Sequence, residues 1–277
     1  MGMETTMATP AMRSEGAIEP QEWWNAESWV PNPDQLSLLD QEIHVWRVFL
    51  DEEEGLLDHC QALLSSGEQA RANRFLVRPE RNRFVITRAI LRELLAAYLG
   101  CSPAALEFEY NTHGKPLLHR KFLKRSVQFN VSHSGGLALL SFSLGRRVGV
   151  DVEFVQPGFA VAEIARQWFS RREDEELSAV PPSLRAERFF VGWTHMEACA
   201  KARGDGLRPF PVGPHASLKP GPFLTSDNSQ WCLHSLRPAP SYVGALVGEG
   251  QDWSPRFLAW KSFATGDDSP PDFTCKN

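Results

Sequence analysis

Three absences narrow the class of protein before any motif is considered. No apolar run approaches membrane-spanning length, and the longest comparable stretch is LALLSFSL at 137–144. An excess of positive charge is also absent, because the formal net charge is −5 and the isoelectric point is near 5.9, which argues against a general nucleic-acid binder. The N-terminal residues lack the apolar segment of a secretion signal. We therefore expect a cytoplasmic protein that binds neither membranes nor nucleic acid.

The cysteines lack the spacing of a disulfide or metal motif. There are 5 of them, an odd number, and no two form a CxxC pair. This distribution is typical of reduced thiols in a cytosol and argues against a disulfide framework or a zinc site. The cysteines are Cys60, Cys101, Cys199, Cys232 and Cys275.

What is present is an ordinary globular composition, with 277 residues, 42% hydrophobic and 23% charged. Residues 1–35 are rich in Glu, Pro, Ser and Met and predict a flexible tail, and the polar residues 263–277 predict a disordered one. Helix and strand patterns between the tails occur in two similar sets. We therefore predict an α+β protein with an N-terminal lobe at 36–148, a C-terminal lobe at 149–262 and a ligand cleft between them.

The expected elements follow from hydrophobic periodicity and from Gly and Pro punctuation. Helices are predicted at 56–64, 67–100 with a break at Pro79, 160–170, 171–180 and 183–204. Strands are predicted at 42–50, 105–110, 126–134, 137–144, 147–155, 215–220, 230–238, 242–249 and 256–263.

The stretch RVGVDVEFV at 147–155 places two carboxylates, Asp151 and Glu153, on one face of a strand. Alternate residues of a strand lie roughly 6.6 Å apart, so the two charges repel each other unless water or a cation intervenes. Both could reach one divalent ion, and the depletion of Asp from strands favours this interpretation. The alternative is an edge strand with a solvated polar face.

The helix with the sequence FFVGWTHMEACAKARG carries Glu197 and Lys201 four residues apart. Taken alone, the pair is best explained as a surface ion pair worth about 0.3–0.5 kcal/mol. The alternative is a third metal ligand beside a phosphate-binding cation. The predicted core stripe of this helix consists of Phe189, Trp193, Met196 and Ala200.

Three further segments contain groups that could bind an anion. FNVSHSGG ends a strand in Ser132, His133 and Ser134, and HGKP places Lys115 on a tight turn; either segment is also explained as an ordinary turn. The stripe of Arg81, Arg88 and Arg92 on the earlier helix is typical of a solvated surface.

Together, HGKP, FNVSHSGG, VGVDVE and WTHMEACAKARGDGL resemble the phosphopantetheinyl transferases, and in particular the larger, monomeric type that activates surfactin-like synthetases. The resemblance covers about residues 43–260. It implies two pseudo-twofold α/β lobes with the active site between them. It also implies transfer of 4′-phosphopantetheine from coenzyme A to a serine of an apo carrier protein of fatty-acid, polyketide or peptide synthesis, with release of adenosine 3′,5′-bisphosphate.

The resemblance also assigns roles to residues of this chain. Asp151, Glu153 and Glu197 match ligands of Mg²⁺, with Mn²⁺ as an alternative, and Asp151 also belongs to the coenzyme A site. Lys201 and Lys115 match contacts to the phosphates. Glu197 is expected to take the serine proton, directly or through a metal-bound water, and Lys201 to stabilise the leaving phosphate. The 3′-phosphate, ribose and nucleotide end match Ser132, His133 and Arg71.

The chain departs from the family pattern at two positions. Met196 and Glu68 stand where family members commonly have lysine, so less positive charge is expected near coenzyme A. For the acidic carrier protein, the basic residues Lys121, Lys124 and Arg125 are the candidate contacts.

Two alternatives come from other classes. A Mg²⁺-dependent phosphodiester hydrolase would also use carboxylates and a lysine, although the Glu153 strand has no lysine two residues on. The other is a non-catalytic relative that binds coenzyme A or a carrier protein, which the two missing lysines would suit.

Overall fold

The computed structural model describes residues 23–25, 28–31, 33, 36–51, 54–112, 114–204, 206, 220–225 and 227–261. The side chains of Trp23 and of residues 123–125 are not described. Most of the predicted tails at 1–35 and 263–277 lies outside the described residues, as do all but the last residue of the predicted strand at 215–220.

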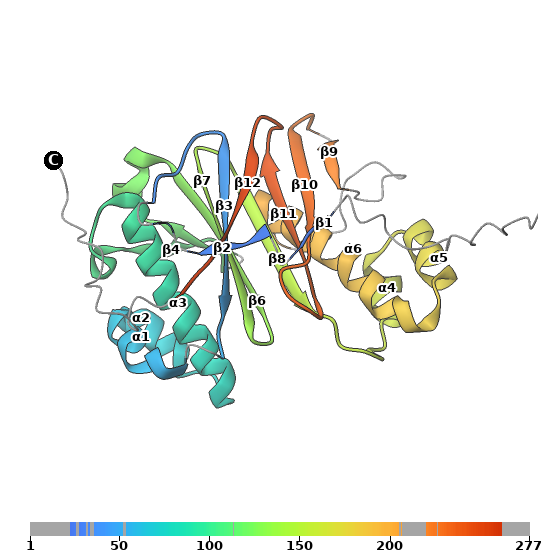
Figure 1. Cartoon of the computed structure of the whole chain (residues 1–277), viewed down its shortest axis with the longest axis horizontal. Coiled ribbons are helices and arrows are strands. Elements are labelled where there is room, and N and C mark those ends of the chain that lie inside the picture. The colour runs from blue at the N-terminus through green and yellow to red at the C-terminus, as the bar shows by residue number, and fades with distance from the viewer. Residues whose placement is uncertain are drawn as a thin grey trace, which may run out of the picture.

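The fold is α+β, as predicted, and its centre is formed by two mixed β-sheets that lie side by side (Figure 1). One sheet has the order β2-β12-β3-β7-β6, and the other has the order β1-β10-β11-β8 with β9 paired to β10. The strands of the first sheet are β2 Val30–Pro31, β12 Ser254–Ala259, β3 Glu42–Phe49, β7 Leu137–Leu144 and β6 Val127–Ser134. Those of the second are β1 Trp23–Trp24, β10 Gln230–Leu236, β11 Tyr242–Glu249, β8 Val148–Phe154 and β9 Gly221–Leu224. A separate hairpin is formed by β4 Phe108–Tyr110 and β5 Pro116–Leu118.

Helices flank the two sheets on opposite sides of the molecule (Figure 1). Those beside the first sheet are α1 Leu57–Leu63, α2 Ser66–Ala72 and α3 Arg78–Leu99. Those beside the second are α4 Ala162–Trp168, α5 Arg171–Ala179 and α6 Pro182–Arg203. Short 3-10 turns occur at Glu54–Leu56, Pro103–Ala105 and Arg120–Arg125.

Near each end of the described chain, a strand joins the sheet that is formed mainly by the other half of the chain. After β11, strand β12 returns to the first sheet, where it lies parallel to β3, while β1 lies parallel to β10 in the second sheet. Trp29 is buried beside Phe257, with ring centroids 5.0 Å apart, and this contact attaches the end of the N-terminal segment. The lobe boundaries at residues 148 and 149 stay a prediction.

The core stripe predicted for α6 is wrong in part. Trp193 and Met196 are only half-buried, and the face that packs on β8 and β11 consists of small side chains, among them Ala198 and Ala202. A Cβ atom at Gly149 of β8 would lie 2.1 Å from the carbonyl oxygen of Ala198. The helix therefore approaches this strand so closely that only glycine fits between them.

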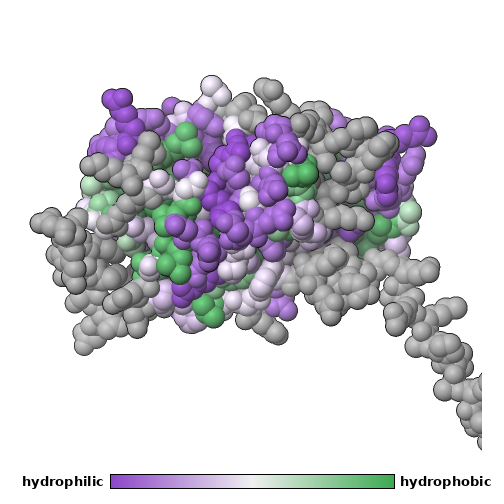
Figure 2. Space-filling view, turned by 90° about the horizontal axis from the view of Figure 1, so that it is seen from above, coloured by the Kyte–Doolittle hydropathy of each residue, from purple (hydrophilic) through white to green (hydrophobic). Residues whose placement is uncertain are grey.

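Most predicted elements are confirmed. The break before Pro79 separates α2 from α3, and Gly100 and Gly204 end the two long helices in the left-handed conformation. The short strands β1, β2, β5 and β9 were not predicted. Hydrophilic side chains run across the middle of the upper face, with hydrophobic ones in smaller areas on either side (Figure 2). No helix among the described residues is long and apolar enough to cross a membrane, and the described cysteines form no disulfide.

Candidate active site

The two sheets meet at a seam between their edge strands, β6 and β8. Alternate side chains of β6 accept hydrogen bonds from backbone N–H groups of β8. Asn130 Oδ1 accepts from Val150 at 3.0 Å, and Ser134 Oγ accepts from Phe154 at 3.1 Å. Ser132 Oγ lies 3.4 Å from the N–H of Val152. Polar side chains thus satisfy part of the exposed edge of β8, and they bring the predicted phosphate-binding segment next to the two carboxylates.

Asp151 is the buried centre of the seam, with only 2% of its surface exposed. Its Oδ1 accepts a hydrogen bond from Ser132 Oγ at 2.7 Å and another from Lys201 Nζ at 2.5 Å. Its Oδ2 has no hydrogen-bond partner among the described residues. The solvated polar face considered from the sequence is therefore wrong for Asp151, and the cation that offsets its charge here is Lys201.

Glu197 and Lys201 are therefore not simply a surface ion pair, because Lys201 donates to the buried Asp151 carboxylate. Burial raises the pKa of Glu197 above its ordinary value of 4.5, and the neighbouring Lys201 opposes this shift. Burial also raises the pKa of Glu153 to about 6, against the hydrogen bond that Ser134 Oγ donates to it at 2.7 Å. The charges of Asp151 and Glu197 raise the pKa of Glu153 further. All three carboxylates therefore act on one another electrostatically.

A cleft of about 400 Å³ opens beside the seam and is lined by both lobes. Of the predicted site residues, it brings together Arg71, Lys115, His133, Glu197 and Lys201. Ser132, Asp151 and Glu153 are not among its lining residues, although Ser132 and Asp151 contact Lys201 directly. The cleft thus has several basic residues in its lining, and one of them, Lys201, contacts the buried Asp151 carboxylate.

Lys115 reaches the cleft from the turn between β4 and β5. The turn is closed by Asn111, whose side chain accepts from the Lys115 N–H at 2.9 Å, and by Gly114, which has a positive φ of 78°. Lys115 Nζ donates to the backbone carbonyl of Lys201. Burial lowers the pKa of Lys115 to about 8, and the charge of Lys201 adds to this effect. Two cations held this close suit a ligand with more than one negative charge.

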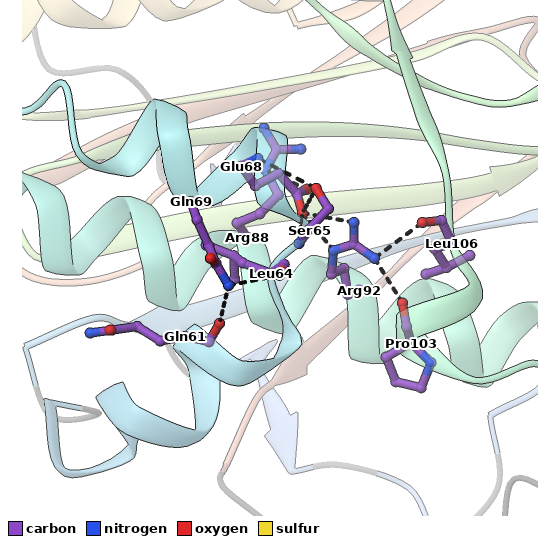
Figure 3. A network of polar contacts seen from close by, with 9 residues as sticks. All are labelled: Gln61, Leu64, Ser65, Glu68, Gln69, Arg88, Arg92, Pro103 and Leu106. Carbon is purple, nitrogen blue, oxygen red and sulfur yellow. Dashed lines mark hydrogen bonds and ion pairs between the residues drawn. The ribbon is translucent and has the colours of Figure 1, made fainter.

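The solvated surface predicted for the arginine stripe of α3 is wrong for Arg88 and Arg92, whereas Arg81 is half-buried. Arg92 and Arg88 are 2% and 8% exposed, and Glu68 is 3% exposed. The Glu68 carboxylate lies 2.7 Å from Arg92 and 3.6 Å from Arg88, and it also completes a capping box with Ser65 (Figure 3). Glu68 therefore holds α2 against α3. Glu68 does not line the cleft. The glutamate that stands in place of the expected lysine therefore affects the contact between α2 and α3 more than the charge of the cleft.

Arg88 lines the cleft, although the sequence analysis assigned it to a solvated arginine stripe and not to the site. Its Nη1 has no hydrogen-bond partner among the described residues. Its guanidinium carbon lies 5.6 Å from the ring centroids of both Phe84 and Phe108. No signal in the sequence distinguishes it from Arg81, because the partner that orders it, Glu68, lies on another helix.

The remaining predicted positions are not gathered at the cleft. Met196 does not line it, so a lysine there would lack a direct path to a ligand in the cleft. Among the predicted carrier contacts, Lys121 pairs with Glu107, and the side chains of Lys124 and Arg125 lie outside the described part of the chain.

The residues predicted to bind a metal fit in chemistry but are not assembled as a set. Carboxylate oxygens are the donors that Mg²⁺ prefers, and the unpartnered Oδ2 of Asp151 is a buried acceptor of this kind. Within the described residues, no group of three or more metal-ligating side chains is placed to hold an ion. The ligand set of Asp151, Glu153 and Glu197 stays a prediction.

Comparison with known proteins covers both lobes. Residues 52–144 match the family model described as 4′-phosphopantetheinyl transferase, N-terminal, and residues 147–247 match that of the 4′-phosphopantetheinyl transferase superfamily. The chain is 38% identical to the 4′-phosphopantetheinyl transferase HetI of Nostoc sp. over 230 residues, which is 83% of this chain and 97% of HetI. It is 32% identical over 172 residues to AcpT of Escherichia coli, covering 55% of this chain and 83% of AcpT. Against Sfp of Bacillus subtilis the identity is 24% over 200 residues, covering 71% and 87%.

Proposed function

Because the chain belongs to the 4′-phosphopantetheinyl transferase family, and is therefore an enzyme that attaches phosphopantetheine to a carrier protein, we propose that coenzyme A is bound in the cleft between its lobes. The observation that carries this proposal is the arrangement around Asp151. Its buried carboxylate, bonded to Lys201 and Ser132, lies next to a cleft lined by Arg71, Lys115 and His133.

The reaction joins the serine Oγ of the carrier to the β-phosphorus of coenzyme A. The bond from that phosphorus to the bridging oxygen of the pyrophosphate breaks, and adenosine 3′,5′-bisphosphate leaves. Glu197 takes the serine proton. Its raised pKa suits this role, because a carboxylate with a higher proton affinity is a better base as long as it remains ionised. Lys201 and Lys115 stabilise the negative charge that develops on the leaving phosphate.

The nucleotide end of coenzyme A lies toward the N-terminal lobe in this proposal. Arg71 is placed over the ring of Phe84, 5.5 Å from its centroid, and the cleft also includes His133. An adenine ring and a 3′-phosphate need an aromatic or guanidinium surface beside a cation. Ser132 acts on this site through Lys201, because its hydroxyl oxygen accepts a hydrogen bond from Lys201 Nζ at 3.0 Å.

Mg²⁺ would be held by Asp151, Glu153 and Glu197, with Mn²⁺ as a substitute. When bound, such an ion neutralises pyrophosphate charge and orients its oxygens. The mutual repulsion of these carboxylates supports the assignment, because a cation would relieve it.

The direct test is incubation with coenzyme A, Mg²⁺ and several apo carrier proteins, followed by mass spectrometry of the carrier. We expect the mass of one phosphopantetheine to be added to the serine, and chelation of divalent ions to stop the transfer. Full activity in excess chelator would refute the metal assignment. Full activity of Glu197→Gln would refute the assigned base.

The finer identity of the enzyme is also part of the proposal. We infer a transferase of the larger, monomeric type that serves surfactin-like synthetases, because the motifs HGKP, FNVSHSGG, VGVDVE and WTHMEACAKARGDGL resemble that type. A cytoplasmic location is inferred from the scattered cysteines. Fatty-acid, polyketide and peptide-synthetase carriers are the substrates to compare. Family membership decides against the phosphodiester hydrolase considered from the sequence.

A further inference from the structure

The loop between α2 and α3 exposes three consecutive apolar side chains, Phe75, Leu76 and Val77. Leu76 is 100% exposed, and it contributes nothing to the core. Single apolar residues on a surface are ordinary, but a run of three at one loop marks an interaction site more often than chance. We call Arg74, Phe75, Leu76, Val77 and Arg78 the 74–78 loop.

The loop is held in place by its backbone. The N–H groups of Arg74 and Phe75 donate to Arg71 and Ala72 at 3.1 and 3.2 Å, and the N–H of Arg81 donates to Val77 at 3.1 Å. The ring of Phe75 also packs on Phe84, with centroids 5.3 Å apart. The apolar side chains are thus presented by a fixed loop, and little ordering is needed before a partner binds.

The charge around the loop is opposite to that of the whole chain. Residues 71–83 contain five arginines and one glutamate, a formal charge of +4, whereas the chain carries −5. Arg83 is paired with Asp51 and Glu80, but Arg74 and Arg78 are exposed and pair with no other described residue. The surface is complementary to an acidic partner that presents apolar side chains between its carboxylates.

The loop is also adjacent to the cleft. Phe84 and Arg71 line the cleft, and Phe75 lies against Phe84. A protein seated on the loop would therefore stand at the cleft mouth, where a serine must enter.

We propose that the 74–78 loop docks the carrier protein, through an acidic helix whose apolar residues cover Leu76 and Val77 and whose carboxylates meet Arg74 and Arg78. The identity of the partner as a carrier rests on the proposed function. The loop takes the place of Lys121, whose charge is already paired with Glu107.

The test compares Leu76→Asp with a matched control, Leu39→Asp. Leu39 is 56% exposed and precedes β3, whereas Asp51, which pairs with Arg83, follows the other end of that strand. Eight residues of strand separate the two ends by roughly 26 Å. We measure kcat and KM for an apo carrier, KM for coenzyme A, and the melting temperature. Leu76→Asp should raise the carrier KM about tenfold or more, with the coenzyme A KM and the melting temperature unchanged, and Leu39→Asp should change none of them.

A second variant tests the charge. Arg74→Glu with Arg78→Glu should raise the carrier KM further and reduce the dependence of that KM on salt. A carrier KM within twofold of the parent for Leu76→Asp would overturn the proposal. So would a parent dimer that Leu76→Asp dissociates, because a second copy of the chain would then be the occupant.

Direct titration of the apo carrier without coenzyme A separates this inference from the proposed function. If the parent binds the carrier but transfers nothing, and Leu76→Asp abolishes the binding, the docking site stands and the transfer proposal fails. If the parent transfers phosphopantetheine and the variant binds and reacts equally well, the docking proposal fails alone. A parent that neither binds nor modifies any carrier refutes both.

Discussion

Helices α3 and α6 are the two long helices of the described chain, and each lies beside one of the two sheets (Figure 1). Each has 22 residues, each has proline in its first turn, and each ends at a glycine in the left-handed conformation. Helix α3 buries large aliphatic side chains such as Ile86, Ile90 and Leu95. Helix α6 instead buries Ala198, Cys199 and Ala202 against β8 and β11.

The difference in side-chain size decides what each helix can do. Small residues let the backbone of α6 lie almost in contact with Gly149, so that Lys201 reaches Asp151 at 2.5 Å. On α3, Arg92 does not line the cleft and instead pairs with the buried Glu68 of α2. One helix therefore uses its ion pair for the fold, and the other places its ion pair at the cleft.

The largest expected effect comes from removing the close approach of α6. In Gly149→Ala, the new Cβ would lie 2.1 Å from the Ala198 carbonyl oxygen and 2.4 Å from the Ala202 nitrogen. Because both are backbone atoms, the whole helix must shift, and we expect a loss of about 3 kcal/mol or more in the free energy of unfolding. Transfer activity should fall with it, since Lys201 moves away from Asp151.

Gly67→Ala in α2 is the matched control, because its Cβ would meet nothing within 4 Å. That variant should be neutral or stabilised by up to about 1 kcal/mol. Denaturant unfolding and a transfer assay measure both variants. A Gly149→Ala protein as stable and active as the parent would show that α6 is free to shift.

The same contrast shows what the sequence could and could not predict. The alternation in β8 and the glycine ends of both long helices are local features, and they were predicted correctly. The core face of α6 was predicted wrongly in part, because large apolar side chains such as Trp193 were taken as stronger indicators of burial than alanine. The burial of Arg92 and the pairing of Asp151 with Lys201 depend on partners 24 and 50 residues away, which periodicity does not reveal. Strand β9, with four residues, is too short to show an alternation.

Breaking the ion pair of α3 should destabilise the protein without changing the chemistry. Arg92→Met leaves the buried Glu68 carboxylate with Arg88, at 3.6 Å, as its nearest remaining cation. We expect a loss of about 3 kcal/mol, because removing one partner of a buried pair strands the other. The kcat of the folded fraction should be nearly unchanged. In the double variant with Glu68→Gln, much of the stability should return; if it does not, the pair is not what holds α2 to α3.

Breaking the ion pair of α6 should impair the chemistry as well as the fold. Asp151 is only 2% exposed, so Lys201→Met strands a buried carboxylate and should lower the unfolding free energy by about 3 kcal/mol. Loss of the cation at the leaving phosphate should reduce kcat about a hundredfold. Steady-state kinetics alongside a melting curve would contradict the comparison if the kcat of Lys201→Met were as little changed as that of Arg92→Met.

The carboxylate next to α6 gives a pH-dependent test. The folded pKa of Glu153 is about 6, above the ordinary value of 4.5, so its contribution to stability is lost as pH rises from 4.5 through 6. The gap corresponds to at most about 2 kcal/mol, and we expect about 1 kcal/mol for this half-buried group. Without metal, Glu153→Gln should match the parent at pH 4.5 and exceed its stability at pH 7. Equal stability at both pH values would mean that the carboxylate is fully solvated.

The smallest expected effect concerns Met196, where the family resemblance led us to expect a lysine. The cleft is lined by Glu197, Ala200, Lys201 and Gly204, which recur at the three- and four-residue spacing of one helix face. Met196 is rotated about 100° from Glu197 around the helix, and it is half-buried beside that face. Met196→Lys should therefore change the Kd for coenzyme A by less than about twofold, although a lysine in reach of a phosphate would tighten binding roughly tenfold or more. Calorimetric titration measures this, with Lys201→Met as the variant that must weaken binding. A tenfold tightening by Met196→Lys would show that the face of α6 turned to the ligand is wider than the cleft residues indicate.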